Sequence, residues 1–259
     1  MQLNLMKKLH VFLQEHEIRY YLIAGSALGA VRHQGFIPWD DDIDIGMYRA
    51  DYEKFLSLAQ DFCSEYEIVN CRNANNCDFG LTRIYFPNTY IEEASIKNTK
   101  LNKQLYFDVF PLDNVPDDWK ARTRYEKQIW KKKSLIMKLD VRNYNNKGYI
   151  LFLKRARALV LQPFRQTILA SFDRLMRKYE NLNTQCVCSL CSQYSFKKQV
   201  MNKELYGTPT LKDFEDSSFF VPEKIDEYLT TLYGADYMLV PPVEKRRKAH
   251  NIYTLYGDS

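Results

Sequence analysis

The segment from Gly25 to Met47 reads GSALGAVRHQGFIPWDDDIDIGM, and the rest of the chain is best interpreted outward from it. An apolar, β-branched and aromatic run precedes it, so the glycine is expected to end a strand in a turn. The small residues from Ser26 to Val31 predict a short helix after that turn. The first turn of such a helix directs backbone N–H groups at an anion, as in many phosphate sites.

Four aspartates occupy the five positions from Asp40 to Asp44. Side chains alternate across a strand, so Asp42 and Asp44 share one face, with Asp40 at the entrance of the strand. Ile43 and Ile45 then point into the core. Carboxylates this close repel one another without cations, and the run is typical of a ligand set for hard divalent ions such as Mg²⁺. The alternative is a solvated acidic turn that caps the next helix.

A second informative segment, residues 105–113, reads LYFDVFPLD and places Asp108 between apolar side chains. A buried carboxylate without compensation is costly, so a partner is expected. A metal shared with Asp42 and Asp44 would be such a partner. A turn or capping role is the alternative for Asp108, and is favoured for Asp113.

Length and composition bound the class of protein. The chain has 259 residues, of which 46% are apolar, enough to bury a substantial core without disulfides. No stretch reaches the roughly 18 uncharged apolar residues of a membrane-spanning helix, and residues 1–10 are typical of an amphipathic helix rather than a signal peptide. These features predict a cytoplasmic protein.

The net charge of +5 conceals a strong asymmetry. Residues 120–178 carry 17 Lys and Arg against three acidic residues, a local net charge of +14, which leaves −9 for the rest of the chain. A basic stripe favours anionic partners: nucleic acid, the anionic face of a membrane or a phosphate-rich substrate. Residues 149–161 combine large apolar side chains with basic ones, which suits peripheral contact with a membrane. It equally suits an ordinary helix packed on the domain.

The pattern of elements predicts an α+β protein. Residues 1–115 form the expected catalytic core, and residues 116–259 form a mainly helical C-terminal appendage that packs on the core and closes the site. Helices are expected at residues 3–15, 49–63, 119–139, 149–161 and 164–180, and strands at 18–24, 67–71, 81–86 and 89–92.

The cysteines present a possible zinc set at Cys186, Cys188 and Cys191. The doubled pairing of a convincing zinc site is missing, and a fourth ligand would have to come from Cys71, Cys77 or His250. Buried, unreactive thiols are therefore the favoured interpretation.

Taken together, the motifs resemble those of one known family. The matching segments are residues 25–47, the FDVFPLD run at 107–113, the YGADYM run at 233–238, Pro241-Pro242 and Arg246. They resemble the LicD family of phosphocholine transferases, to which the fukutin-type ribitol phosphate transferases are more distantly related. The resemblance implies a nucleotidyltransferase-like fold, a short mixed sheet flanked by helices with metal-binding carboxylates on adjacent strands.

The resemblance also implies a reaction. The family moves a phosphoalcohol, usually phosphocholine from CDP-choline, to a sugar hydroxyl of a surface glycan such as lipopolysaccharide or teichoic acid, or of its lipid-linked precursor, and releases CMP. It implies that Asp42, Asp44 and Asp108 are the catalytic, metal-binding carboxylates for Mg²⁺, with Mn²⁺ as an alternative. Gly25 and Ser26 match the phosphate-binding turn. Ala235 departs from the tighter motif of many relatives, so no role is assigned to Asp236.

Five further residues are candidates for substrate binding. Arg32 and His33 follow the phosphate-binding turn, and Arg246 and His250 could reach the site from the C-terminal segment. Trp39 could form one wall of the aromatic cage that a quaternary ammonium group needs. The alternatives are surface positions for the basic residues and a core position for Trp39.

Two other functions remain open. An NTP-dependent nucleotidyltransferase acting on RNA or a small molecule would use the same carboxylates, although nucleic acid is the less favoured partner. A catalytically inactive binding module is the third hypothesis. Release of CMP from a CDP-alcohol, as opposed to pyrophosphate from an NTP, separates the first two.

Overall fold

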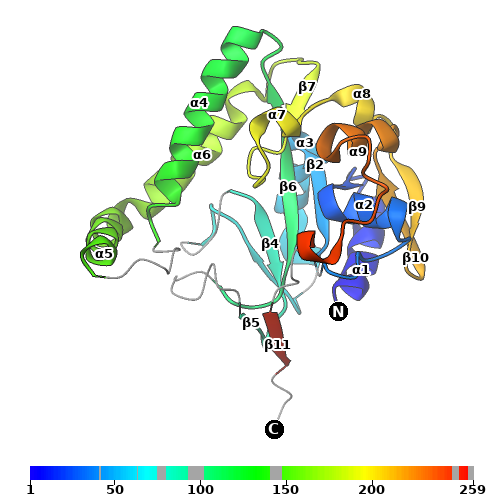
Figure 1. Ribbon diagram of the computed structural model, residues 1–259, viewed down its shortest axis with the longest axis horizontal. Coiled ribbons are helices and arrows are strands. Elements are labelled where there is room, and N and C mark those ends of the chain that lie inside the picture. The colour runs from blue at the N-terminus through cyan, green and yellow to red at the C-terminus, as the bar shows by residue number, and fades with distance from the viewer. Residues whose placement is uncertain are drawn as a thin grey trace.

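A computed structural model describes residues 1–40, 42–62, 64–74, 80–92, 102–140, 148–246 and 251–255 (Figure 1). The strands of its main sheet are β1 (Tyr21–Leu22), β2 (Asp44–Tyr48), β3 (Glu67–Val69), β4 (Thr82–Tyr85), β6 (Tyr106–Val115), β7 (Cys186–Cys188) and β8 (Val200–Asn202). In these described ranges the sheet is seven-stranded and runs β1-β2-β6-β4-β3, with β7 on β6 and β8 on β7. Parallel and antiparallel pairs both occur, so the sheet is mixed, as expected.

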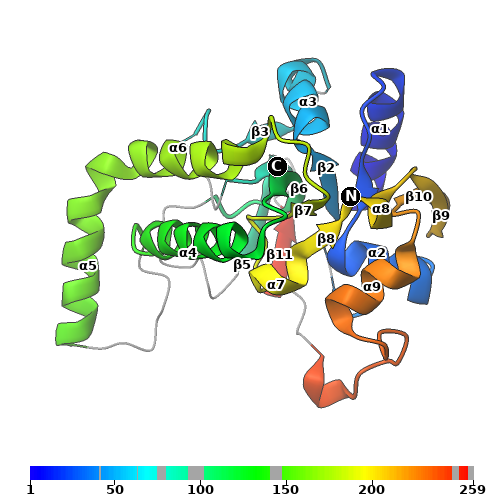
Figure 2. The ribbon, with the colours of Figure 1, turned by 90° about the horizontal axis from the view of Figure 1, so that it is seen from above.

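Helices cover both faces of this sheet. The longer ones are α1 (Gln2–Glu15), α2 (Ala24–Arg32), α3 (Arg49–Phe62), α4 (Trp119–Ile136), α5 (Tyr149–Leu161), α6 (Arg165–Met176) and α9 (Ile225–Tyr233). Helices α1 and α3 lie on one side, and α2 and α9 on the other (Figure 2). The short ones are α7 (Phe196–Gln199), α8 (Lys203–Tyr206), η1 (Gln162–Phe164), η2 (Arg177–Tyr179) and η3 (Val243–Lys245).

Strand β6 is the centre of the fold. Almost all of its residues are buried, and it pairs in parallel with β2 and antiparallel with β4. Parallel strands are covered on both faces, which explains the apolar run around Asp108. On the side of β6 that pairs with β4 and β7, the pairing with β4 ends at Val109 and the pairing with β7 begins at Asp113. Pro111 lies in the gap between them. A proline without an N–H is tolerated where no neighbouring strand needs that donor.

The C-terminal half contains more strand than the sequence predicts. In addition to β7 and β8, it forms a hairpin of β9 (Thr210–Phe214) and β10 (Ser217–Val221), and β5 (Thr89–Glu92) pairs with β11 (Asn251–Leu255). The turn of the hairpin is Glu215-Asp216, with Glu215 at a φ of 57°. It lacks the Asn-Gly or Asp-Gly signal by which such a turn is normally recognised in a sequence.

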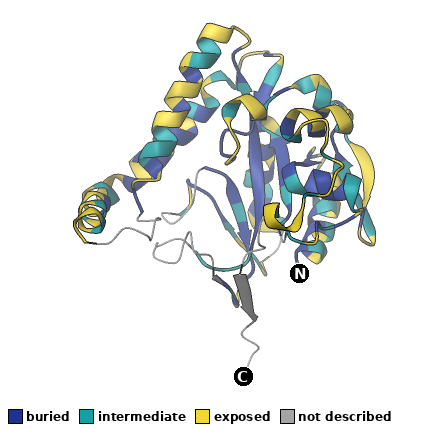
Figure 3. Cartoon of the chain, in the orientation of Figure 1, coloured by how far each residue is buried: buried dark blue, intermediate teal, exposed yellow. Residues whose placement is uncertain are grey.

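Helices α4 and α6 run side by side away from the sheet, and α5 lies across their far end (Figure 2). Burial is concentrated in β2 and β6, whereas α5 is largely exposed (Figure 3). Among the helices described, none is long and apolar enough to cross a membrane.

A buried ion pair between α3 and β6 lies just beyond the end of the β2–β6 ladder. Arg49, the first residue of α3, donates from Nε and Nη2 to the two carboxylate oxygens of Asp113, both at 2.7 Å. Burial alone would lower the pKa of Arg49, but the adjoining carboxylate more than reverses this and keeps the guanidinium charged. Arg49 also bonds Glu53, and Asp173 of α6 lies 3.9 Å away, so the network ties the helical half to the sheet.

We predict that Asp113→Asn lowers the free energy of unfolding by about 3 kcal/mol, because it leaves a buried guanidinium without its bidentate partner. Urea unfolding of the purified variant measures this. The matched control is Glu65→Gln, which breaks the exposed pair of Glu65 with Lys8 and should cost less than about 1 kcal/mol. Equal losses in the two variants would contradict a structural role for the buried pair.

Candidate active site

The parallel pairing of β2 with β6 places two aspartates side by side. Asp44 is opposite Asp108 at the start of the ladder, with Ile45 opposite Val109 next to them. Ile43 and Ile45 on either side of Asp44 are fully buried. Their burial confirms the prediction that the two isoleucines anchor this segment in the core.

The carboxylates around Asp44 act on one another. Burial raises the pKa of the Asp44 carboxyl well above its usual range, and the negative charges of Asp42 and Asp108 raise it further. Asp40 acts in the same direction, whereas the guanidinium of Arg83 opposes it. The structure thus brings together the three predicted metal ligands and Asp40 as one repelling cluster.

Arg83 supplies positive charge to this cluster. It lies directly opposite Asp108 on β4 and donates from Nε to a carboxylate oxygen of Asp108 at 2.9 Å. Its guanidinium also lies 3.9 Å from the centre of the Tyr106 ring, which holds it in place. Arg83 was missing from the sequence prediction because it is a single charge inside an apolar strand, and only the pairing of β4 with β6 gives it a partner.

The strand-to-helix turn differs from the prediction. Ala24, not Gly25, adopts the left-handed conformation, with a φ of 48°, and Gly25 already belongs to α2. A non-glycine residue held in this region stores strain, which is common at functional sites. The backbone N–H of Ala24 donates to the hydroxyl of Tyr228 on α9 at 3.1 Å, so α9 fixes the turn. No signal in the sequence connects Tyr228 to this position.

Gly25 has a different role. A Cβ atom at this position would lie 2.5 Å from an oxygen of Asp40, so a larger residue would displace that carboxylate from the start of α2. Ser26 is buried, and its hydroxyl accepts a hydrogen bond from the N–H of Asp44 at 2.8 Å. Both residues therefore lie at the carboxylate cluster, and Ser26 positions Asp44.

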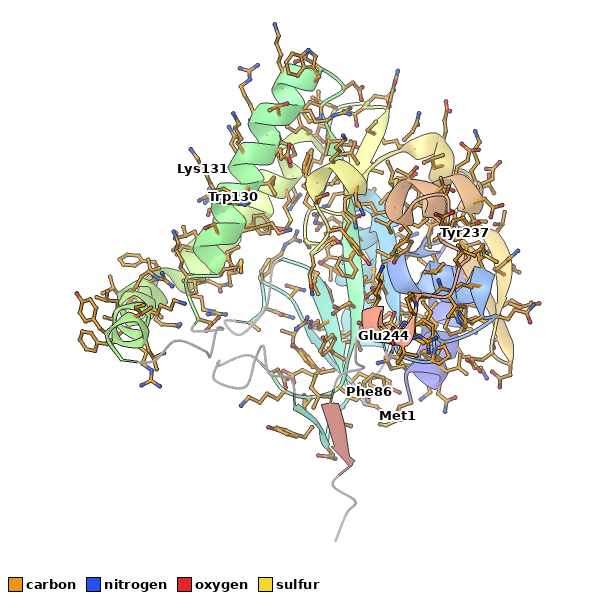
Figure 4. The ribbon with its side chains drawn as sticks, viewed as in Figure 1. Met1, Phe86, Trp130, Lys131, Tyr237 and Glu244 are labelled. Carbon is orange, nitrogen blue, oxygen red and sulfur yellow. The ribbon has the colours of Figure 1, made fainter. Side chains whose placement is uncertain are left out.

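Three predicted substrate-binding residues gather around the indole ring of a fourth, Trp39. The guanidinium groups of Arg246 and Arg32 lie 4.3 and 5.9 Å from the centre of the Trp39 ring, and the ring of His33 meets it edge-on at 5.8 Å. Arg32 also donates from Nη1 to the carbonyl of Tyr237 at 2.9 Å. This bond fastens the segment between Tyr237 and Glu244, both labelled in Figure 4, to the end of α2.

The carboxylate cluster and the residues around Trp39 adjoin each other, because Trp39 directly precedes Asp40 in the chain. Burial lowers the pKa values of Arg32 and His33, and the charge of Arg32 lowers that of His33 further. His250, the remaining predicted substrate-binding residue, lies outside the described residues.

The predicted carboxylates are the kind of ligand that a hard cation prefers, but their oxygens do not converge on a single ion position in this structure. Across the described ranges, no group of three or more His, Cys, Asp or Glu side chains is arranged to hold a metal ion. The crowding of like charges at Asp44 would be relieved by a cation, and the all-oxygen donor set suits Mg²⁺. The ligand types therefore fit Mg²⁺, but the geometry does not, because Asp108 is paired with Arg83.

The cysteines form no such site among the described residues. Cys188 and Cys191 are buried, and burial raises the pKa of both thiols well above the usual range, which disfavours the thiolates that zinc needs. The Cys191 thiol instead contacts the sulfur of Met176 at 3.4 Å. Cys77 lies outside the described residues.

Comparison with known proteins adds independent evidence. The sequence profile described as "LicD/FKTN/FKRP, nucleotidyltransferase domain" matches residues 17–148. Lipopolysaccharide cholinephosphotransferase LicD of Haemophilus influenzae is 29% identical over 262 residues, which span 98% of this chain and 94% of that protein. An uncharacterised protein of Rickettsia prowazekii is 53% identical over 115 residues, 44% of this chain and 40% of its own length.

A shorter match is found in human ribitol 5-phosphate transferase FKRP, 51% identical over 39 residues, 15% of this chain and 8% of FKRP. The profile spans half of the chain, and it includes the turn at α2, the acidic run and the strand that carries Asp108. The chain therefore belongs to the LicD family of phosphoalcohol transferases.

Proposed function

We propose that this protein transfers phosphocholine, or a similar phosphoalcohol, from a CDP-activated donor to a sugar hydroxyl of a cell-surface glycan or its lipid-linked precursor, and releases CMP. The observation that carries the proposal is the pairing of Asp44 with Asp108 across β2 and β6, next to the start of α2. The names of the Haemophilus and human relatives, a cholinephosphotransferase and a ribitol phosphate transferase, support the class of reaction.

Transfer of a phosphoryl group demands little covalent chemistry from a protein. It requires that the charge on the phosphate oxygens is neutralised and that the two reactants are held in line. Asp42, Asp44 and Asp108 would hold Mg²⁺, with Mn²⁺ as the alternative. When bound, such an ion neutralises phosphate charge and makes an acceptor hydroxyl more acidic.

The chain's own groups have complementary tasks. The backbone N–H of Ala24 donates to Tyr228. The next two amides, those of Gly25 and Ser26, lie in the first turn of α2, where a helix binds an anion. Asp108 would accept the proton of the acceptor hydroxyl, with the guanidinium of Arg83 balancing its negative charge through the ion pair. Asp108 would have to exchange part of its contact with Arg83 for the ion.

The cluster around Trp39 would bind the donor. Arg32, His33 and Arg246 place positive or polarisable groups next to Asp40, where a diphosphate would need compensation. The Trp39 face suits a quaternary ammonium group, although in this structure Arg246 lies over the ring at 4.3 Å. Choline would therefore compete with Arg246 for this face.

We predict that the purified protein with Mg²⁺ releases CMP from one member of a panel of CDP-choline, CDP-ribitol, CDP-glycerol and CDP-ethanolamine. Asp44→Asn should lower kcat by about 100-fold or more, because it removes a charged oxygen from the proposed ion site. The control is Asp61→Asn on the exposed side of α3, which should retain the wild-type rate. CMP is measured by chromatography, with mixed glycan acceptors present.

Two results would contradict the proposal. One is release of pyrophosphate from an NTP without CMP release from any CDP-alcohol, which favours nucleotidyl transfer. The other is an Asp44→Asn variant that folds and keeps the wild-type rate.

We further predict that Trp39→Leu raises KM for the CDP donor by about tenfold with a smaller change in kcat, since it removes the ring against which both guanidinium groups lie. Steady-state kinetics at saturating acceptor measure both constants. Trp119→Leu, which removes an exposed indole at the start of α4, should leave KM unchanged. A Trp39→Leu enzyme with an unaltered KM would exclude the ring from donor binding.

A further inference from the structure

Helix α5 exposes an unusual number of large apolar side chains. Tyr149, Phe152, Leu159 and Val160 are between 65% and 75% exposed, and Ile150 and Leu153 are also exposed. Its main packing partner is η1, the turn that directly follows it. Exposed apolar clusters of this kind are characteristic of interaction sites rather than of ordinary surface.

Five of these six exposed apolar residues share one face of the helix. Tyr149, Leu153 and Val160 follow one another at spacings of four and seven residues, and Phe152 and Leu159 form the adjacent row. Ala158, on the opposite side, is the buried position of the helix. The apolar face is therefore turned away from the protein.

Basic side chains border this face. Arg155 and Arg157 are exposed on its two flanks, and Lys154 is partly exposed, whereas residues 149–161 contain no acidic residue. Trp130 and Lys131 on the outer side of α4, seen in Figure 4, extend the same combination of apolar and basic groups. Long basic side chains beside an apolar face can extend to lipid headgroups while their stems lie against the acyl region.

The few acidic residues of this region are directed inward. Asp140 pairs with Arg165 at 2.9 Å, and both side chains are buried. Asp173 pairs with Arg72 at 3.1 Å in the network behind α6. Of the three acidic residues in the basic segment 120–178, only Glu126 is exposed, so the outward charge is almost entirely positive.

We propose that α5 is a membrane-docking helix that lies in the interface of an anionic phospholipid bilayer, with its apolar face inserted and Arg155 and Arg157 at the headgroups. The charge complementarity selects this occupant, because the rim is cationic on both sides and carries no acidic group. At 13 residues the helix is too short to span a bilayer, which takes about 20. Its position at the far end of α4 and α6 lets it meet a flat surface (Figure 1). The docking is independent of the reaction catalysed.

Flotation of the 259-residue chain with vesicles tests the proposal. The vesicles are phosphatidylcholine alone, or phosphatidylcholine and phosphatidylglycerol at about 7:3. Wild type should bind the anionic vesicles preferentially and lose binding as salt is raised. Phe152→Gln/Leu159→Gln should lower the partition coefficient by about tenfold or more, through lost apolar insertion. Arg155→Gln/Arg157→Gln should lose most of the preference for anionic lipid.

The control is Val11→Gln/Leu211→Gln, which changes two apolar residues of similar exposure on α1 and β9 and should bind like wild type. Circular dichroism verifies that each variant is folded. The proposal is overturned if wild type binds neither kind of vesicle, or if the α5 variants float as well as the control. It is also overturned if light scattering shows a dimer that Phe152→Gln/Leu159→Gln converts to monomer, because the face would then belong to a second copy of the chain.

Discussion

The parallel pairing of β2 with β6 is the constraint on which the rest of the structure depends. It fixes Asp44 opposite Asp108 at one end of the ladder and brings Arg49 to Asp113 just beyond the other end. A slip of one residue would turn every side chain to the other face and bury the aspartates in place of the isoleucines. The burial of Ile43 and Ile45 therefore sets the geometry of the carboxylate cluster.

The aspartates at the two ends of this ladder differ in the charges that surround them. Asp113 receives two hydrogen bonds from Arg49, so its charge is compensated within the core. Burial raises the pKa of both carboxyls, but Arg49 opposes the rise at Asp113, whereas the charges of Asp42 and Asp108 add to it at Asp44. A carboxyl whose pKa is raised by neighbouring carboxylates is characteristic of sites that bind a ligand or carry out chemistry.

Much of this arrangement follows from local sequence patterns. Alternating aspartate and isoleucine predicted which face of β2 carries the carboxylates, and the periodicity of residues 149–161 predicted the bounds of α5 as the structure has them. Contacts between distant segments were not predictable. The ion pair of Arg83 with Asp108 depends on the pairing of β4 with β6. The turn at Ala24 depends on Tyr228 of α9. No local pattern in the sequence indicates either contact.

The turn at α2 illustrates the same limit. A glycine after an apolar strand normally supplies the left-handed residue of a turn. Here Ala24 takes that conformation, and Gly25 instead makes room for Asp40, fifteen residues further along the chain. The space that Gly25 leaves is therefore used by a tertiary contact with Asp40, which the local sequence does not report.

We expect the aspartates that face each other on β2 and β6 to act as one divalent-ion site. The most direct test is binding of Mn²⁺, followed by electron paramagnetic resonance, to wild type and to Asp44→Asn and Asp108→Asn. We expect saturable binding that Mg²⁺ displaces and that either substitution weakens by about tenfold or more. Binding that is absent from wild type, or unchanged in both folded variants, would contradict it.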